Sequence, residues 1–186
     1  MSRRAQITDA AIATLARAGL RGLTHRAVDR AAGLPEGSAS YYYRTRQALL
    51  AAMVERLAEL DTAELDTPPG PDPAAHAAAA AVLIEQWVTA SRDRHIARYE
   101  LTLEATRRPE LRATLAASGA AIRAAAARHL AAAGISDPDR RAATYVDFVD
   151  GMLFHQIAGD GTRQLTSADL RDTIGTLLAA VTSADP

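Results

Sequence analysis

Apolar residues recur every three or four positions along most of this chain, which is the spacing of one face of an α-helix. Runs of β-branched residues in strand-like alternation are sparse, and alanine is abundant. The pattern predicts an all-α protein of about nine helices. The longer helices are expected over residues 3–18, 46 into the sixties, 74–91, 92–107, 109–133, 138–158 and from 166 or 167 onward, with two short helices between 24 and 43.

Helix-breaking residues divide the chain. The segment Thr-Pro-Pro-Gly-Pro-Asp-Pro at 67–73 holds four prolines and predicts a loop. The alanine run that follows leads into Val82, Leu83 and Ile84, which favours a helix over a disordered tract. We expect a small N-terminal domain over 1–47 and a larger helical domain over 48–186, with the helix at 48–65 connecting them.

The stretch from 24 to 50 has the features of a helix-turn-helix unit. Thr24 is a good N-terminal cap for a first short helix, and Gly33 is able to end that helix with a positive backbone angle. Pro35 suits the first position of a second short helix, and Thr45 caps the helix that follows. Units of this kind lay their second helix in the major groove of DNA.

Side chains on this unit also favour DNA. Three consecutive tyrosines cannot all be buried on one helix, so we expect Tyr43 to share the inward face of Ala39 while Tyr41 and Tyr42 point outward. Hydroxyls and guanidinium groups donate to phosphate oxygens. The predicted phosphate contacts are Thr24, Arg26, Tyr41, Tyr42 and Arg46, and Arg44 is a further predicted DNA contact. The residues expected nearest the base edges are His25, Gly37, Ser38 and Ser40.

Charge is unevenly distributed along the chain. Residues 1–50 hold eight arginines and three acidic residues, a net charge of +5, whereas residues 51–186 hold 13 arginines and 19 acidic residues, a net charge of −6. A basic head of this kind displaces counterions from DNA. The chain has no cysteine, which excludes disulfides, thiolate metal sites and thiol nucleophiles. No long apolar run and no signal peptide is apparent, so we expect a soluble, cytoplasmic protein. We also expect that the protein needs neither a metal nor a cofactor.

Residues 3–50 resemble the DNA-binding domain of the TetR family of bacterial transcriptional regulators. The likeness is carried by Arg3-Arg4, ITDAA at 7–11, GLRGLTHRAV at 19–28, AAGLPEGS at 31–38, SYYYRTR at 40–46 and ALL at 48–50. The resemblance implies a homodimeric, all-helical repressor that binds double-stranded operator DNA and carries a small-molecule effector pocket in its C-terminal part. Ser40 and Tyr43 depart from the family, in which tyrosine and phenylalanine are frequent at these positions; the hydroxyl of Tyr43 needs a polar neighbour.

The effector pocket and the dimer contact are expected in the C-terminal part. The candidate pocket residues are Trp87, His95, Tyr99, Leu103, Tyr145, Phe148, Met152 and His155. An apolar stripe on the last helix, together with Gly151 for close helix approach, predicts the dimer contact. The candidate interface residues are Gly151, Leu170, Ile174, Leu177, Leu178 and Val181. The alternative is that these stripes only cover the core of a single chain.

Two other functions stay open at this point. A helical enzyme with a vestigial DNA-binding head is one, but the five histidines lack metalloprotease spacing and no nucleophile-elbow motif occurs. A DNA-binding protein that responds to no effector is the other. Sequence-selective binding of an operator, and its release by a small molecule, separate the three possibilities.

Overall fold

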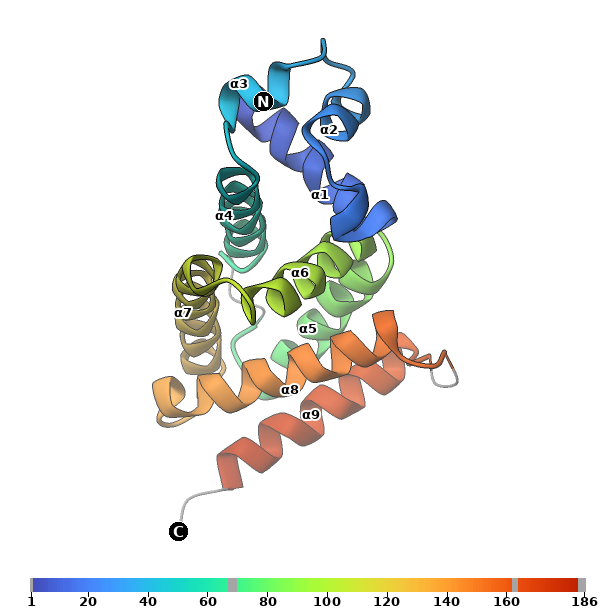
Figure 1. Ribbon diagram of the computed structural model, residues 1–186. Coiled ribbons are helices and arrows are strands. Elements are labelled where there is room, and N and C mark those ends of the chain that lie inside the picture. The colour runs from blue at the N-terminus through green and yellow to red at the C-terminus, as the bar shows by residue number, and fades with distance from the viewer. Residues whose placement is uncertain (1, 67–69, 162–163, 184–186) are drawn as a thin grey trace. The chain divides into compact units, whose positions relative to one another are not determined.

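The computed structural model describes residues 2–66, 70–161 and 164–183 and confirms the all-α class (Figure 1). These described residues contain nine helices and no strand. The helices are α1 (Arg3–Gly22), α2 (His25–Ala32), α3 (Ser38–Tyr42), α4 (Arg46–Glu64), α5 (Pro73–Val88), α6 (Arg92–Ala105), α7 (Pro109–Ala132), α8 (Pro138–Ala158) and α9 (Ser167–Ser183). Residues 67–69 of the predicted loop lie outside the described part. None of the described helices has the length and hydropathy required to cross a membrane.

The chain forms two compact units that do not follow the expected division at residue 47. The first unit joins Met1–Leu60 with Asp93–Gly119, and the second joins Asp61–Arg92 with Ala120–Pro186. Most of α4 therefore packs with the N-terminal helices, because its apolar face is continuous with theirs. The unit also gains most of α6 and the start of α7, which supply Ala97, Leu101 and Leu111 to the same core.

The core of the first unit is built on one apolar face each of α1 and α4. Ile7, Leu15 and Met53 are fully buried, and Leu57 is almost so. An ion pair fixes the two helices at their edge, with 2.8 Å between Nε of Arg56 and Oδ1 of Asp9. Ala18, near the end of α1, is exposed.

The turns of the N-terminal unit agree with the sequence in part. Gly33 ends α2 with φ of +65°, as predicted, and the hydroxyl of Thr24 caps α2 by accepting from the amide of Ala27 at 3.1 Å. Gly19 adopts φ of +62° at the predicted end of α1, but a further turn reaches Gly22 beyond that kink. Pro35 does not begin α3. It lies in a turn that ends at Gly37, whose φ of +96° prevents helical geometry before Ser38.

The core of the second unit brings α5, α8 and α9 together, with α7 supplying small residues. Figure 1 shows α8 and α9 side by side. Alanines such as Ala77, Ala81 and Ala126 are buried there among larger residues of α9. Their small size permits close approach of the helices, which explains how an alanine-rich sequence fills a core.

A cluster of aromatic polar side chains is buried in this second core. The Nε2 atom of His76 lies 2.8 Å from the hydroxyl of Tyr145, and the rings of His76 and His129 are 6.3 Å apart. Nε2 of His129 lies 2.7 Å from the carbonyl oxygen of Leu65. Burial, reinforced by the nearby His129, lowers the pKa of His76 to about 4, and burial raises the pKa of Tyr145.

Mild acid should destabilise both units. In the first unit, burial, with Arg98 and Arg94 nearby, lowers the pKa of His95 to about 3. Both His76 and His95 are thus neutral in the fold, whereas an unfolded chain protonates histidine below about pH 6.5. The free energy of unfolding should therefore fall as the pH drops below 6.5, by about 2 kcal/mol for each residue at pH 5 relative to pH 8.

Urea denaturation at pH 8 and pH 5 measures this difference. Because His76→Gln has no titratable group at that position, the variant should lose about half of the combined effect of the two histidines. A wild-type stability that is equal at the two pH values would contradict the assignment of these histidines as neutral core residues.

Candidate nucleic-acid interface and effector pocket

The short helix α3 presents one face to the core and the other to solvent. Ala39 and Tyr43 are buried, and Tyr41 is 79% exposed, as predicted. Tyr42 is only half-buried and packs against the core of the first unit, with its ring edge-on to that of Tyr41 at 5.3 Å. The outward surface of α3 therefore combines Tyr41 with the small residue Ser40.

Arg4 belongs to this surface, and no local sequence pattern had indicated it as a contact residue. Its guanidinium carbon lies 5.9 Å from the ring centre of Tyr42 and 5.8 Å from that of Tyr43, within the range of cation–π attraction. Arg4 is also the polar neighbour that the hydroxyl of Tyr43 requires. Burial raises the pKa of Tyr43, and the charge of Arg4 and a hydrogen bond with it oppose that shift.

The remaining predicted cations differ in what they contact. Arg26 is exposed and lies 3.6 Å from the equally exposed carboxylate of Glu36, a contact of little energetic weight. Arg44 is exposed. Arg46 points inward instead: its Nη1 donates to the carbonyl oxygen of Leu23 at 2.5 Å, and its Nη2 donates to that of Leu20.

Two of the Arg46 nitrogens are thus used on carbonyl groups of the last turn of α1 and of Leu23. A sequence pattern does not reveal these contacts, because the partners are backbone atoms more than twenty residues away. That Arg46 binds phosphate stays a prediction. His25 also has a backbone partner: its Nε2 lies 2.7 Å from the carbonyl oxygen of Tyr43, so the ring ties the start of α2 to the end of α3. Its place near the base edges stays a prediction.

Three small residues remain at the start of α3. Gly37 is exposed and has no side chain that would hold a partner away. The hydroxyl of Ser38 donates to the carbonyl oxygen of Pro35 at 2.6 Å, and that of Ser40 donates to Gly37 at 3.0 Å. Both hydroxyl oxygens retain acceptor capacity. Thr24, whose oxygen caps α2, retains a proton to donate.

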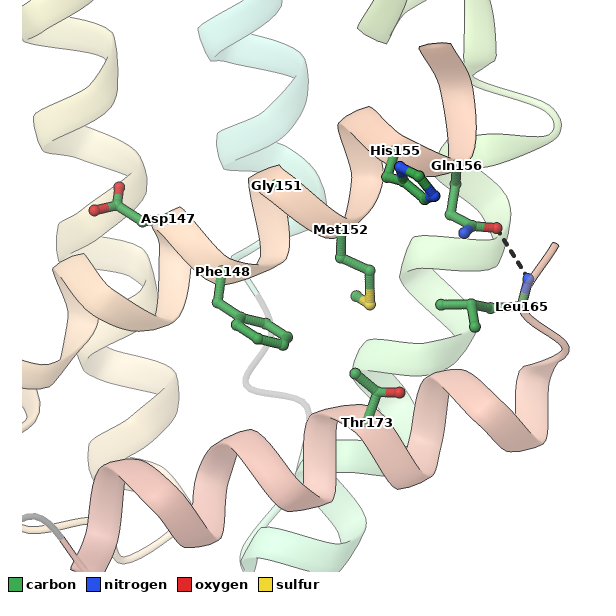
Figure 2. Close-up of a pocket in the computed structure, with 8 residues that line it drawn as sticks. All are labelled: Asp147, Phe148, Gly151, Met152, His155, Gln156, Leu165 and Thr173. Atoms are coloured by element: carbon green, nitrogen blue, oxygen red, sulfur yellow. Dashed lines mark hydrogen bonds between the residues drawn. The ribbon is translucent and has the colours of Figure 1, made fainter. Parts of the chain in front are cut away.

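A groove of about 380 Å³ lies between α8 and α9 (Figure 2). Phe148 and Met152 point from α8 toward α9, and Thr173 points back from α9. Leu165 closes one end, where its amide donates to Oε1 of Gln156 at 3.0 Å. Three of the eight predicted pocket residues line this groove, namely Phe148, Met152 and His155.

The other five predicted pocket residues do not line it. Tyr145 is in the second core, bonded to His76, and the indole nitrogen of Trp87 donates to Oε2 of Glu64 at 2.7 Å. His95, Tyr99 and Leu103 belong to the first unit. Leu103 is 62% exposed, and His95 is fully buried.

The α9 residues predicted for the dimer contact lie inside the chain. Leu170, Ile174, Leu177, Leu178 and Val181 are all at least nine-tenths buried in the core of the second unit. The stripe covers the core of the single chain, as the alternative states, because the apolar face of α9 packs on α5. Gly151 differs from these five: it is exposed, and a Cβ atom added there would meet no atom within 4 Å.

Comparisons with known proteins agree with this architecture. The family model for bacterial regulatory proteins of the tetR family matches residues 7–53, and the model for the tetracyclin repressor-like C-terminal domain matches residues 71–183. A comparison with curated proteins gives no match.

Solved structures provide further relatives. A TetR-family member from Streptomyces coelicolor A3 is 30% identical, with a TM-score of 0.74 over 95% of this chain and 98% of that one. The multidrug-binding protein EbrR, in complex with ethidium, is 29% identical, with a TM-score of 0.72 over 95% and 98% of the two chains. A TetR-family regulator from Rhodococcus sp. is 24% identical, with a TM-score of 0.78 over 97% and 98%, and shows the shared fold.

The two family models cover both parts of the chain, and the second alone covers more than half of it. The helix-turn-helix, the basic head and the all-helical body are the features expected of such a protein. This chain therefore belongs to the TetR family of bacterial transcriptional regulators, which bind DNA and are not enzymes.

Proposed function

We propose that the protein is a repressor that binds a palindromic operator as a homodimer and leaves it when a small molecule binds. The observation that carries the DNA-binding part is the surface of α2 and α3. On this surface the exposed Tyr41, Ser40 and Gly37 lie on a helix-turn-helix unit that also carries the exposed Arg26 and Arg44. Units of this kind place their second helix in the major groove. Phosphate contacts come from Thr24, Arg26, Tyr41, Tyr42 and Arg44, with Arg4 as an addition. Ser38 and Ser40 lie nearest the bases.

The exposed face of α8 supports dimerisation through this helix. Thr144, Phe148, Gly151 and His155 follow one another at the spacing of one helix face, and all four are exposed, with Phe148 at 44%. A glycine in an exposed helix interior costs about 1 kcal/mol relative to alanine. Gly151 has no positive φ and no close neighbour that would explain it. Close approach of the backbone of a second chain to this face would explain the glycine at position 151.

Dimerisation raises the affinity for DNA above that of a single head. One short recognition helix contacts few base edges, whereas two linked heads gain affinity through effective concentration. A two-fold dimer places its recognition helices about 34 Å apart, one turn of DNA. We therefore expect an operator with two inverted half-sites.

The effector is proposed to bind in the second unit, whose helices the tetracyclin repressor-like C-terminal family model matches over residues 71–183. EbrR, which shares the fold of the whole chain, is solved in complex with ethidium, proflavin and malachite green. We propose a planar aromatic cation of this chemical class. A coupling free energy of about 1–3 kcal/mol changes operator affinity by roughly 5–150-fold.

Titration with proflavin and with ethidium tests the effector class. Each dye should quench the fluorescence of Trp87, the single tryptophan of the chain, and should weaken operator binding by about fivefold or more at saturation. Operator binding is followed by fluorescence anisotropy of a labelled DNA fragment with a far-red label, and free dye with labelled DNA alone is the control for intercalation. Tight operator binding that saturating dye leaves unchanged would contradict this effector class.

A further inference from the structure

Asp29, near the middle of α2, connects the two helices of the DNA-binding unit. Its side chain is buried, with only 3% of the residue exposed. Oδ2 accepts from the amide of Gly37 at 2.8 Å, and Oδ1 accepts from the amide of Ala39 at 2.6 Å. The backbone carbonyl of the same residue accepts from the amide of Leu34 at 2.9 Å. One residue thus binds both the turn and the start of α3.

The recognition helix needs such an external partner. It has only five residues, and a helix of this length is unstable alone. The amides in its first turn have no acceptor within the helix. Gly37, at the N-cap, has no side chain to supply one, and no local side-chain cap is formed. The carboxylate of Asp29 fills this role from α2.

We propose that Asp29 is a positioning residue that fixes the angle and register of α3 on α2, and thereby sets operator specificity without touching DNA. This inference rests on the proposed operator-binding function. A carboxylate that is 3% exposed does not reach a base or a phosphate. It also occupies the amides of Gly37 and Ala39, so that α3 reads DNA through side chains and not through its N-terminal amides.

A second carboxylate in the same unit separates positioning from general stability. Asp9 accepts from Arg56 and holds α1 to α4, and α3 is not part of that contact. Asp9→Asn therefore makes the same chemical change as Asp29→Asn in the same compact unit. The asparagine at 29 keeps one acceptor oxygen and replaces the other with an NH₂ group, which opposes one of the two amides.

The experiment uses the full-length protein and an operator selected by the wild type from a library of random DNA duplexes. Asp29→Asn should bind this operator about tenfold or more weakly. Its low-salt binding of an unrelated duplex should equal that of the wild type, so the specificity ratio falls. Helix content by circular dichroism should be retained, while amide hydrogen exchange at Gly37 and Ala39 becomes faster. Asp9→Asn should keep the wild-type ratio.

Several outcomes overturn the proposal. One is an unchanged specificity ratio in Asp29→Asn, and another is an equal loss of ratio in Asp9→Asn. If Asp29→Asn does not fold, amide hydrogen exchange of the operator-bound wild type tests the role. The amides of Gly37 and Ala39 should then stay protected from exchange. Loss of that protection on operator binding refutes the role of Asp29. A wild type that selects no sequence from the library would instead refute the proposed function itself.

Discussion

Gly151→Arg should convert the dimer to monomers and weaken operator binding by about a hundredfold or more, because avidity between two heads is lost. The fold should survive, since Gly151 is exposed and a Cβ atom added there meets no atom within 4 Å. Helix propensity even favours arginine over glycine by about 1 kcal/mol. An arginine on the exposed face of α8 blocks the close approach of a second α8, and its charge repels the arginine at the same position of the second chain.

Sedimentation equilibrium and DNA-binding titrations measure the two consequences. Gly151→Ala is the matched control, because a methyl group still permits close approach and the variant should remain dimeric with a slightly higher melting temperature. A dimeric Gly151→Arg with normal operator affinity would show that another surface forms the dimer. Substitution of Leu177 does not test the interface, because this side chain is 7% exposed in the core and a charge there unfolds the second unit.

Arg46→Ala and Arg44→Ala should both weaken DNA binding, the first by destabilising the fold and the second by removing a phosphate contact. Removing Arg46 leaves the carbonyl groups of Leu20 and Leu23 without their charged donor. The free energy of unfolding should fall by about 2 kcal/mol or more. The dependence of affinity on salt concentration should change little, because two of the Arg46 nitrogens donate to backbone carbonyls.

Arg44 is the neighbouring control, and it is exposed. Arg44→Ala should leave the melting temperature unchanged and lower the slope of log affinity against log salt by about one. The measurements are thermal denaturation and operator affinity at four salt concentrations. The reverse pattern, in which Arg46→Ala lowers the slope and Arg44→Ala lowers the melting temperature, would invert the two assignments.

Much of the fold could be predicted because helix formation is governed by local patterns. The expected bounds of the long helices differ from the observed ones by a few residues, and Gly33 and Thr24 end and begin α2 as their chemistry requires. Pro35 shows the limit of local reasoning. It is acceptable in a first helical turn, but Gly37 two residues later adopts a positive φ and delays α3.

The candidate sites were harder to predict because they depend on contacts between distant residues. Arg46 and His25 have the chemistry of DNA contacts, but both bind backbone carbonyls that the fold brings near. The stripe on α9 has the composition of either an interface or a core, and only its packing on α5 decides. The role of Asp29 could not be predicted from the sequence, because its two amide partners lie eight and ten residues away. An acidic residue in a basic head suggests only a solvated surface.

Two copies of this chain should present paired recognition helices to one symmetric DNA site. Selection of DNA by the wild-type protein from random duplexes at moderate salt, followed by footprinting and by the stoichiometry of the complex, measures this. We expect an inverted repeat whose half-sites are centred about one helical turn apart, bound by two chains and protected on both halves. Enrichment of no sequence, or of a single half-site bound by one chain, would contradict it.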